Sequence, residues 1–128
     1  MFTAAETAYL KSQFLGRLAT RRSDGTLQNS PVGFRVNDDG TIDVGGRRLR
    51  QTAKWRNVVD NGEVAFVVDD LASVRPWSPR GVEVRGHAEP LEGQEPVMAG
   101  MTSQVIRVRP RWIFSWGLGE SGGPRRLG

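Results

Sequence analysis

Apolar and polar residues alternate over most of the chain, with the period of two that is typical of β-strands packed on one face. Tight-turn sequences, Ser-Asp-Gly-Thr at 23–26 and Asn-Asp-Asp-Gly-Thr at 37–41, separate the first three alternating segments, which we therefore expect in meander order. In all, the alternation predicts six strands, at residues 15–20, 27–36, 41–46, 63–70, 82–91 and 104–118.

Two other segments carry helix signals. Residues 3–15 begin with Thr3 and Glu6 at the spacing of a capping box. Residues 51–62 hold Thr52, a residue type that commonly caps a helix N-terminus. The residues expected on the inward faces are Leu10 and Phe14 in the first helix and Trp55, Val58 and Val59 in the second.

Glycine and proline interrupt some of the strand patterns. Pro31 and Gly33 stand in the middle of the strand at 27–36, and proline cannot donate to a strand ladder. We therefore expect that strand to lie at an edge, to be bulged, or to expose its backbone there. Gly86 predicts a bulge, and residues 71–81, with two prolines and a tryptophan, predict a loop.

Six short strands with short flanking helices in 128 residues predict a mainly β protein, a small six-stranded β-barrel. A chain of this length forms one domain, which we place at residues 1–118. Residues 119–128 are rich in glycine, so a flexible C-terminal tail is expected there.

Composition narrows the class of protein. The hydrophobic content of 38% and the charged content of 25% are those of a soluble globular protein, and no apolar run reaches a membrane-spanning length. The N-terminal segment has polar and acidic residues where a signal peptide has an apolar core, so we expect a cytoplasmic protein. The absence of cysteine excludes disulfides, thiolate metal ligands and a cysteine nucleophile, and a single histidine, His87, argues against a histidine-rich metal centre.

The charge of +4 permits nucleic-acid binding but does not require it. Sixteen arginines and two lysines are typical of a GC-rich genome, and against that background Lys54 is the informative cation. A nucleic-acid barrel needs aromatic residues interleaved with cations on exposed strand faces, whereas Phe66 and the tryptophans stand in apolar or loop contexts. We expect no nucleic-acid partner. The arginines interpreted as solvated surface are Arg21, Arg22, Arg107, Arg109, Arg125 and Arg126.

The sequence contains no motif that is typical of a hydrolytic enzyme. His87 in an alternating strand is interpreted as a hydrogen-bonded structural histidine. No serine occupies a nucleophile-elbow context, and no Walker or Rossmann glycine pattern is present. The carboxylates interpreted as turn formers are Asp24, Asp38, Asp39, Asp69 and Asp70.

One segment has the residues of an anion site. Gly45 and Gly46 end a strand, where a ligand can approach the backbone closely. Thr52 begins a helix whose N-terminus favours a phosphate, and Lys54 and Arg56 add positive charge. A basic helix on a barrel surface explains the same segment equally well.

The strings TIDVGG, QTAKWRNVVDNGEVAFVVDD and PWSPRGVEVRGHAE resemble the split β-barrel flavin/deazaflavin oxidoreductases, which share the fold of pyridoxamine 5′-phosphate oxidase. The resemblance covers about residues 5–118 and is nearest to the F420-dependent (PPOX-class) branch. It implies a split barrel, and a homodimer with the cofactor in a groove between subunits.

The same resemblance implies roles for individual residues. Lys54 is similar to the family's phosphate-binding lysine, and the backbone at 31–33 is similar to the strand that lies along the ring of the cofactor. Trp77 and Arg80 fall in the segment expected to reach the partner subunit's site. The further implied cofactor contacts are Pro31, Val32, Gly33, Gly45, Gly46, Arg47, Thr52, Arg56 and Asn57.

The function implied is hydride transfer between reduced coenzyme F420 and a small organic substrate. Binding, orientation and exclusion of water are then the protein's tasks, and no catalytic side chain is required. Two alternatives stay open within this fold, an FMN-binding protein and a haem-binding protein with His87 as candidate ligand. A basic nucleic-acid-binding barrel is the remote alternative from another class.

Overall fold

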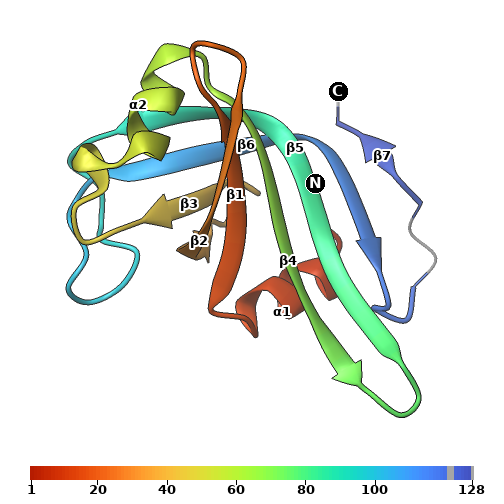
Figure 1. The fold of residues 1–128 in the computed structure, drawn as a ribbon. Helices are drawn as coiled ribbons and strands as arrows, with labels where there is room; N and C mark the ends of the chain where they lie inside the picture. The colour runs from red at the N-terminus through yellow and green to blue at the C-terminus, as the bar shows by residue number, and fades with distance from the viewer. Residues whose placement is uncertain (121–122, 128) are drawn as a thin grey trace.

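The computed structural model describes residues 1–120 and 123–127 (Figure 1). Its helices are α1 (Ala4–Lys11), the 3-10 helix η1 (Leu49–Gln51) and α2 (Ala53–Asp60). Its strands are β1 (Leu15–Arg21), β2 (Leu27–Val36), β3 (Ile42–Gly45), β4 (Glu63–Ser73), β5 (Ser78–Leu91), β6 (Val105–Trp116) and β7 (Arg125–Arg126). None of the helices in the described residues is long and apolar enough to cross a membrane.

Strands β1 to β6 form a closed antiparallel barrel. The order of the sheet is β3-β2-β1-β4-β5-β6-β7, and β3 pairs again with β6, which closes the ring of six. The short strand β7 pairs with β6 as the last strand of the sheet, with Arg126 opposite Trp112. The predicted fold class, a mainly β six-stranded barrel with short helices, is confirmed.

The inward positions of the six strands make one apolar core. Leu18, Val84 and Ile113 have no exposed surface, and the rings of Phe34 and Phe66 meet edge to face at 5.3 Å. Burying an aliphatic or aromatic side chain of this size stabilises the fold by about 1.5–3 kcal/mol. Helix α1 covers one end of this core with Tyr9 and Leu10, and α2 lies at the other end of β1 (Figure 1).

The capping box predicted at the start of α1 is confirmed. The Glu6 backbone N–H donates to Thr3 Oγ1 at 3.1 Å, and the Thr3 N–H donates to Glu6 Oε1 at 2.9 Å. The helix ends four residues earlier than predicted, because the Ser12 hydroxyl donates to the Tyr9 carbonyl at 2.6 Å and closes the last turn. Phe14 therefore lies outside the helix and is 78% exposed, so its predicted inward position is wrong.

Helix α2 is capped by Thr52 as predicted, with the Trp55 N–H donating to Thr52 Oγ1 at 3.3 Å. Val58 is buried and Trp55 packs against the core, as expected. Val59 is 61% exposed, so its predicted inward position is wrong. The reason is geometric, since each helical residue turns about 100° from the one before it.

The loop predicted at 71–81 is mostly strand. β4 continues to Ser73 and β5 begins at Ser78, which leaves a short turn between them. Asp70 stands opposite Arg80 in this hairpin, and Asp69 also lies in β4, so the turn roles predicted for both aspartates are wrong. Asp24 and Asp39 do form turns, each accepting a backbone N–H two residues ahead.

The two predicted irregularities of the sheet are present. The register of β5 on β6 shifts between Arg85 and Gly86, as a bulge requires. Pro31 pairs with Arg17 of β1, but β3 ends at Gly45, opposite Gly33, so the other side of Pro31 has no strand beside it. The proline thus occupies a local edge, where its missing N–H costs no ladder bond.

Two arginines interpreted as solvated surface are in fact paired with buried acids. Arg107 donates to Asp43 at 2.8 Å, and Arg125 pairs with Glu6. Arg125 belongs to β7, so part of the segment 119–128 is strand. Residues 121–122 and 128 of that segment lie outside the described residues, and its flexibility stays a prediction.

Candidate functional site

The predicted site residues fall into three neighbouring groups and one distant pair. Residues 31–33 lie on β2, Gly45 ends β3 directly opposite Gly33, and η1 joins β3 to α2, which Thr52 caps and which holds Lys54, Arg56 and Asn57 (Figure 1). Trp77 and Arg80 lie instead at the far end of the β4–β5 hairpin (Figure 1). Ten of the predicted residues therefore follow one path through β2, the end of β3 and the segment from η1 into α2, namely Pro31, Val32, Gly33, Gly45, Gly46, Arg47, Thr52, Lys54, Arg56 and Asn57.

Lys54 is the unusual residue of this group. Its side chain is partly buried, and burial lowers the pKa of its ammonium group below the usual value. Within residues 1–120 and 123–127 it makes no ion pair and no side-chain hydrogen bond. A partly desolvated cation of this kind favours an anion as its partner.

The N-terminus of α2 presents hydrogen-bond donors next to Lys54, which is the second residue of that helix. Thr52 Oγ1 donates to the Leu49 carbonyl at 2.6 Å while accepting the Trp55 N–H, so the hydroxyl is held in place. The first amides of a helix have no partner within the helix, and the helix dipole adds partial positive charge. Lys54 and this helix end together have the donor chemistry that a phosphate group requires.

The side chains of Arg56 and Asn57 differ in how firmly hydrogen bonds hold them in place. Arg56 is exposed, and its guanidinium donates at 3.3 Å to the Gln51 carbonyl beside the helix start. Asn57 is buried, and its Nδ2 donates to Thr20 Oγ1 at 3.0 Å and to Gln28 Oε1 at 3.4 Å. Arg56 can therefore turn to a ligand without breaking a buried contact, whereas Asn57 ties α2 to the barrel. The phosphate contact expected for Asn57 stays a prediction.

The glycines of β2 and β3 form a flat patch of backbone. A Cβ atom at Gly45 would lie 2.8 Å from Met101 Sδ and from Val97 Cβ, and a Cβ atom at Gly33 would lie 3.0 Å from Met101 Cε. Residues 92–104, between β5 and β6, thus cover the patch with their own side chains. Sequence reasoning missed this contact, although two methionines three residues apart are the signal in the sequence.

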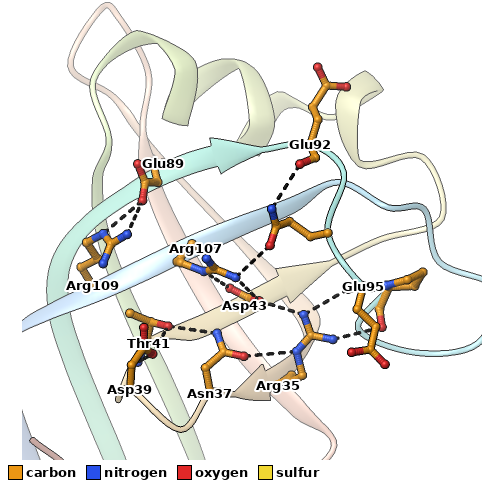
Figure 2. A network of polar contacts seen from close by, with 12 residues as sticks. Arg35, Asn37, Asp39, Thr41, Asp43, Glu89, Glu92, Glu95, Arg107 and Arg109 are labelled. Carbon is orange, nitrogen blue, oxygen red and sulfur yellow. Dashed lines mark hydrogen bonds and ion pairs between the residues drawn. The ribbon is translucent and has the colours of Figure 1, made fainter.

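The acid Asp43 is a second residue that sequence reasoning missed. It stands on the outer side of β3 with its carboxylate fully buried between Arg35 and Arg107 (Figure 2). Burial alone would raise the pKa of Asp43, but hydrogen bonds from Arg107 and Arg35 outweigh it and lower that pKa below its usual value. The available signal in the sequence was an acidic residue between two apolar residues, Ile42 and Val44, whose side chains are buried.

At the hairpin, Trp77 is 67% exposed. Arg80 donates to both carboxylate oxygens of Asp70, at 2.7 and 3.0 Å, and its guanidinium lies 5.2 Å from the ring centre of Tyr9. The hydrogen bond from Arg80 holds the pKa of Asp70 below its usual value. The partner-subunit role expected for Trp77 and Arg80 stays a prediction.

Two expectations about side-chain surroundings need correction. His87 is partly buried, but in the described part of the chain it makes no hydrogen bond of the predicted kind. Trp112 and Trp116 lie neither in the barrel core nor in a loop, because they form a partly exposed row with Phe114 along the outer face of β6. The Arg85 guanidinium lies 4.1 Å from the Trp112 ring centre.

A closed six-stranded antiparallel barrel with short flanking helices is the architecture of the split-barrel class of oxidoreductases. The chain belongs to the pyridoxamine 5′-phosphate oxidase family, whose sequence profile matches residues 2–117.

Known proteins similar to this chain agree with that assignment. The chain is 40% identical over 119 residues to a 5a,11a-dehydrotetracycline/5a,11a-dehydrooxytetracycline reductase of Streptomyces rimosus, covering 91% of this chain and 84% of the relative. Its fold is similar to that of a conserved hypothetical protein from Mycobacterium tuberculosis, with a TM-score of 0.73, 23% identity, and coverage of 100% and 92% of the two chains. It is also similar to an FAD binding protein from Mycobacterium smegmatis, with a TM-score of 0.67, 26% identity and 98% of each chain covered.

Proposed function

We propose that this protein is an F420-dependent reductase that transfers hydride between the reduced deazaflavin and a small organic substrate. The observation that carries the proposal is Lys54, a partly buried cation without an anionic partner in the described residues, beside the N-terminus of α2. Coenzyme F420 has a phosphate and an acidic tail, and its deazaflavin ring supplies the hydride chemistry.

Each part of the site has a task in this proposal. Lys54, the Thr52 helix start and Arg56 bind the phosphate, while Gly46 and Arg47 line the path from β3 to α2. The backbone of β2 at 31–33 lies along the ring, since β3 ends at Gly45, opposite Gly33, and leaves Pro31 without a neighbouring strand on that side. Asn57 keeps α2 in register with the barrel through its bonds to Thr20 and Gln28.

The relative from Streptomyces rimosus supports reduction of the organic substrate as the direction of the reaction. It is named as a reductase of dehydrotetracyclines, so an unsaturated small organic molecule is the substrate class that we propose here. We propose further that the protein is a cytoplasmic homodimer, with the cofactor groove between subunits and with Trp77 and Arg80 reaching the partner's site. Mass determination by light scattering tests the dimer.

Titration of the purified protein with F420, FMN, FAD and haemin, followed by the fluorescence of its four tryptophans, tests the cofactor. We expect tight binding of F420 and its weakening by about 1–3 kcal/mol in Lys54→Ala, through loss of a charge-assisted hydrogen bond. Lys11→Ala is the matched control, because Lys11 is the other lysine of the chain and is exposed on α1.

Other outcomes of the titration would replace the proposal. Binding of FMN or FAD without F420 would support the flavin alternative, and haemin binding lost in His87→Ala would support the haem alternative. Binding of mixed-sequence DNA with a steep salt dependence would support a nucleic-acid face. Equal F420 affinity of Lys54→Ala and the unmodified protein would remove Lys54 from the site.

A further inference from the structure

A cavity of about 230 Å³ opens on the outer face of the barrel, over the neighbouring strands β1 and β4 (Figure 1). Two alanines, Ala19 and Ala65, stand directly opposite each other on these strands and make its floor. Leu18 and Phe66, their neighbours in the chain, are buried in the core, so the alternation of the strands turns both alanine side chains outward. Val67, two positions after Ala65, continues the same apolar floor.

Trp116 forms one wall of this cavity. It stands opposite Gly81, and a Cβ atom added to Gly81 would lie 2.5 Å from Trp116 Cζ2. The indole therefore lies directly against the backbone of Gly81, in space that a side chain there would occupy. Phe114 contacts the same indole, with the two ring centres 5.5 Å apart. The cavity thus has an aromatic wall whose position is fixed by two neighbours.

Polar side chains line the two ends of the cavity. Arg17 and Asn29, both hydrogen-bond donors, lie at the end nearest β2. Arg17 Nη1 donates to Asp69 at 3.2 Å, which leaves the other N–H groups of its guanidinium for a ligand. Glu83 lies at the end nearest β5 and accepts a hydrogen bond from Arg85 Nε at 3.1 Å. The interior between these ends is apolar.

The donor end of the cavity adjoins the strand that is expected to hold the cofactor ring. Arg17 pairs with Pro31 of β2 on one side and with Val67 of β4 on the other. Because neighbouring strands lie about 4.8 Å apart, the cavity begins about 5 Å from Pro31 and its floor is about 10 Å away. A molecule in the cavity therefore lies beside the backbone of residues 31–33.

We infer that this cavity is the substrate site, that it takes one aromatic ring carrying a conjugated carbonyl group, and that Arg17 binds the carbonyl oxygen. This inference rests on the proposed function, which places the ring of the cofactor along β2 beside Pro31.

The size and the lining of the cavity determine this substrate class. A protein cavity of about 150 Å³ takes a benzene molecule. About 230 Å³ therefore holds one ring with a short side arm and excludes a broad fused-ring system. The alanine floor and the indole wall suit a flat aromatic ring. A carbonyl oxygen accepts a hydrogen bond from Arg17, whereas the apolar interior offers no partner to the many hydroxyl groups of a sugar.

Arg17 also has a task in the proposed reduction. The substrate's conjugated C=C bond accepts hydride from reduced F420, which is left oxidised, and the electron pair of that bond moves onto the carbonyl oxygen. The Arg17 guanidinium stays protonated and stabilises the negative charge on this oxygen. Water then supplies the proton that completes the saturated ketone.

Methyl resonances of the cavity floor test binding directly and need no cofactor. Protein labelled with carbon-13 in its alanine and valine methyl groups is titrated with benzylideneacetone, an aromatic ring with a conjugated ketone. The resonances of Ala19, Ala65 and Val67 should shift and saturate, whereas that of Ala8, exposed on α1, should not move. Absence of saturable shifts would overturn the cavity as a site. Tighter binding of tetracycline, a broad fused-ring molecule, at the same methyl groups would overturn the substrate class.

Filling the floor tests the cavity by mutation. Ala65→Leu removes no hydrogen bond but occupies the cavity, so the affinity for benzylideneacetone should fall severalfold. Ala72→Leu is the matched control, because it makes the same substitution on the same strand at an exposed position outside the cavity. Ala19→Leu covers the case in which Ala65→Leu does not fold, and it should give the same loss. Equal affinities of the filled variant and Ala72→Leu would overturn the site.

The role of Arg17 is tested with two ligands. Arg17→Met keeps a long side chain but has no N–H donor. Its affinity for benzylideneacetone should fall severalfold, while its affinity for styrene, which has the ring and the double bond but no carbonyl, should not change. Arg21→Met is the control, since Arg21 lies on the same strand outside the cavity and pairs with Glu63. Equal changes for the two ligands would overturn the contact between Arg17 and the carbonyl oxygen.

A second copy of this chain is the other occupant that an exposed apolar floor suits. Shifts of the floor methyl groups on dilution of the protein, with none on addition of benzylideneacetone, would assign the cavity to a subunit interface and overturn the substrate site.

Kinetics with reduced F420 and benzylideneacetone separate the two roles. Ala65→Leu should raise KM severalfold, Arg17→Met should lower kcat severalfold, and neither should change the affinity for F420. Unchanged kinetics in both variants would overturn the inference. Failure of F420 to bind, alongside saturable methyl shifts, would instead overturn the proposed function and support the cavity as a ligand site.

Discussion

Glu6 and Arg125, separated by 119 positions in sequence, form an ion pair that joins the first helix to the last strand. Glu6 has no exposed surface, and its carboxylate also accepts the Ser115 hydroxyl at 2.6 Å and the Thr3 N–H at 2.9 Å. The pair holds both chain ends against β6.

Replacing Arg125 by Ala should lower the free energy of unfolding by about 2–4 kcal/mol, because a buried carboxylate loses its charged partner. Arg126→Ala is the matched control, since Arg126 is exposed and makes no ion pair in the described residues. Urea unfolding followed by tryptophan fluorescence measures both. Equal stability of the two variants would contradict the role of the pair.

The pH dependence of stability should carry the signature of Glu6. Burial alone would raise the pKa of Glu6, but hydrogen bonds from Arg125, Ser115 and Thr3 outweigh it and lower that pKa from 4.5 to about 2. A lowered folded-state pKa stabilises the fold above pH 4.5, and this contribution is lost as the pH falls toward 2. Unfolding measured from pH 6 to pH 2 should show less acid sensitivity in Glu6→Gln, which has nothing to protonate there.

The strands could be predicted from sequence because their pattern is local. The predicted strand at 27–36 agrees with β2 at both ends, since alternation and two turn sequences bound it. The hairpin at 71–81 could not be found that way, because its prolines resemble loop residues while its strands are held by the cross-strand pair of Asp70 and Arg80.

The partners of individual arginines could not be predicted from the sequence either, because they too depend on contacts between distant segments. Arg107 and Arg21 look alike in sequence, yet Arg107 binds a buried acid 64 positions away and Arg21 binds an exposed one. Lys54 could be singled out because lysine is rare in this chain and a cap residue stands two positions before it. The position of Asp43 between two apolar residues did not reveal its partners, since only the barrel brings Arg35 and Arg107 to its sides.

Replacing Gly45 and replacing the neighbouring Gly46 by alanine should have different effects on the stability of the fold. Gly45→Ala would place a Cβ 2.8 Å from Val97 Cβ, a contact that must shift residues 92–104. We expect a loss of about 1–3 kcal/mol of stability from this overpacking. At Gly46 the nearest atom to an added Cβ is Leu49 Cδ1 at 3.5 Å, an ordinary contact, so Gly46→Ala should be nearly neutral. Thermal unfolding compares the two, and a neutral Gly45→Ala would show that the segment is not packed on the patch.

Cofactor affinity should depend on pH through Lys54. Burial lowers the pKa of the free ammonium group, and a bound phosphate raises it again by favouring the charged form. Binding at alkaline pH therefore takes up a proton, and the affinity for F420 should fall as the pH rises through the pKa of Lys54 in the free protein. Lys54→Arg provides the control, because guanidinium stays charged over this range, so that variant should bind with little pH dependence. Titration calorimetry in two buffers of different ionisation enthalpy measures the proton uptake. Equal pH profiles of F420 affinity for the unmodified protein and Lys54→Arg would show that Lys54 does not bind the phosphate.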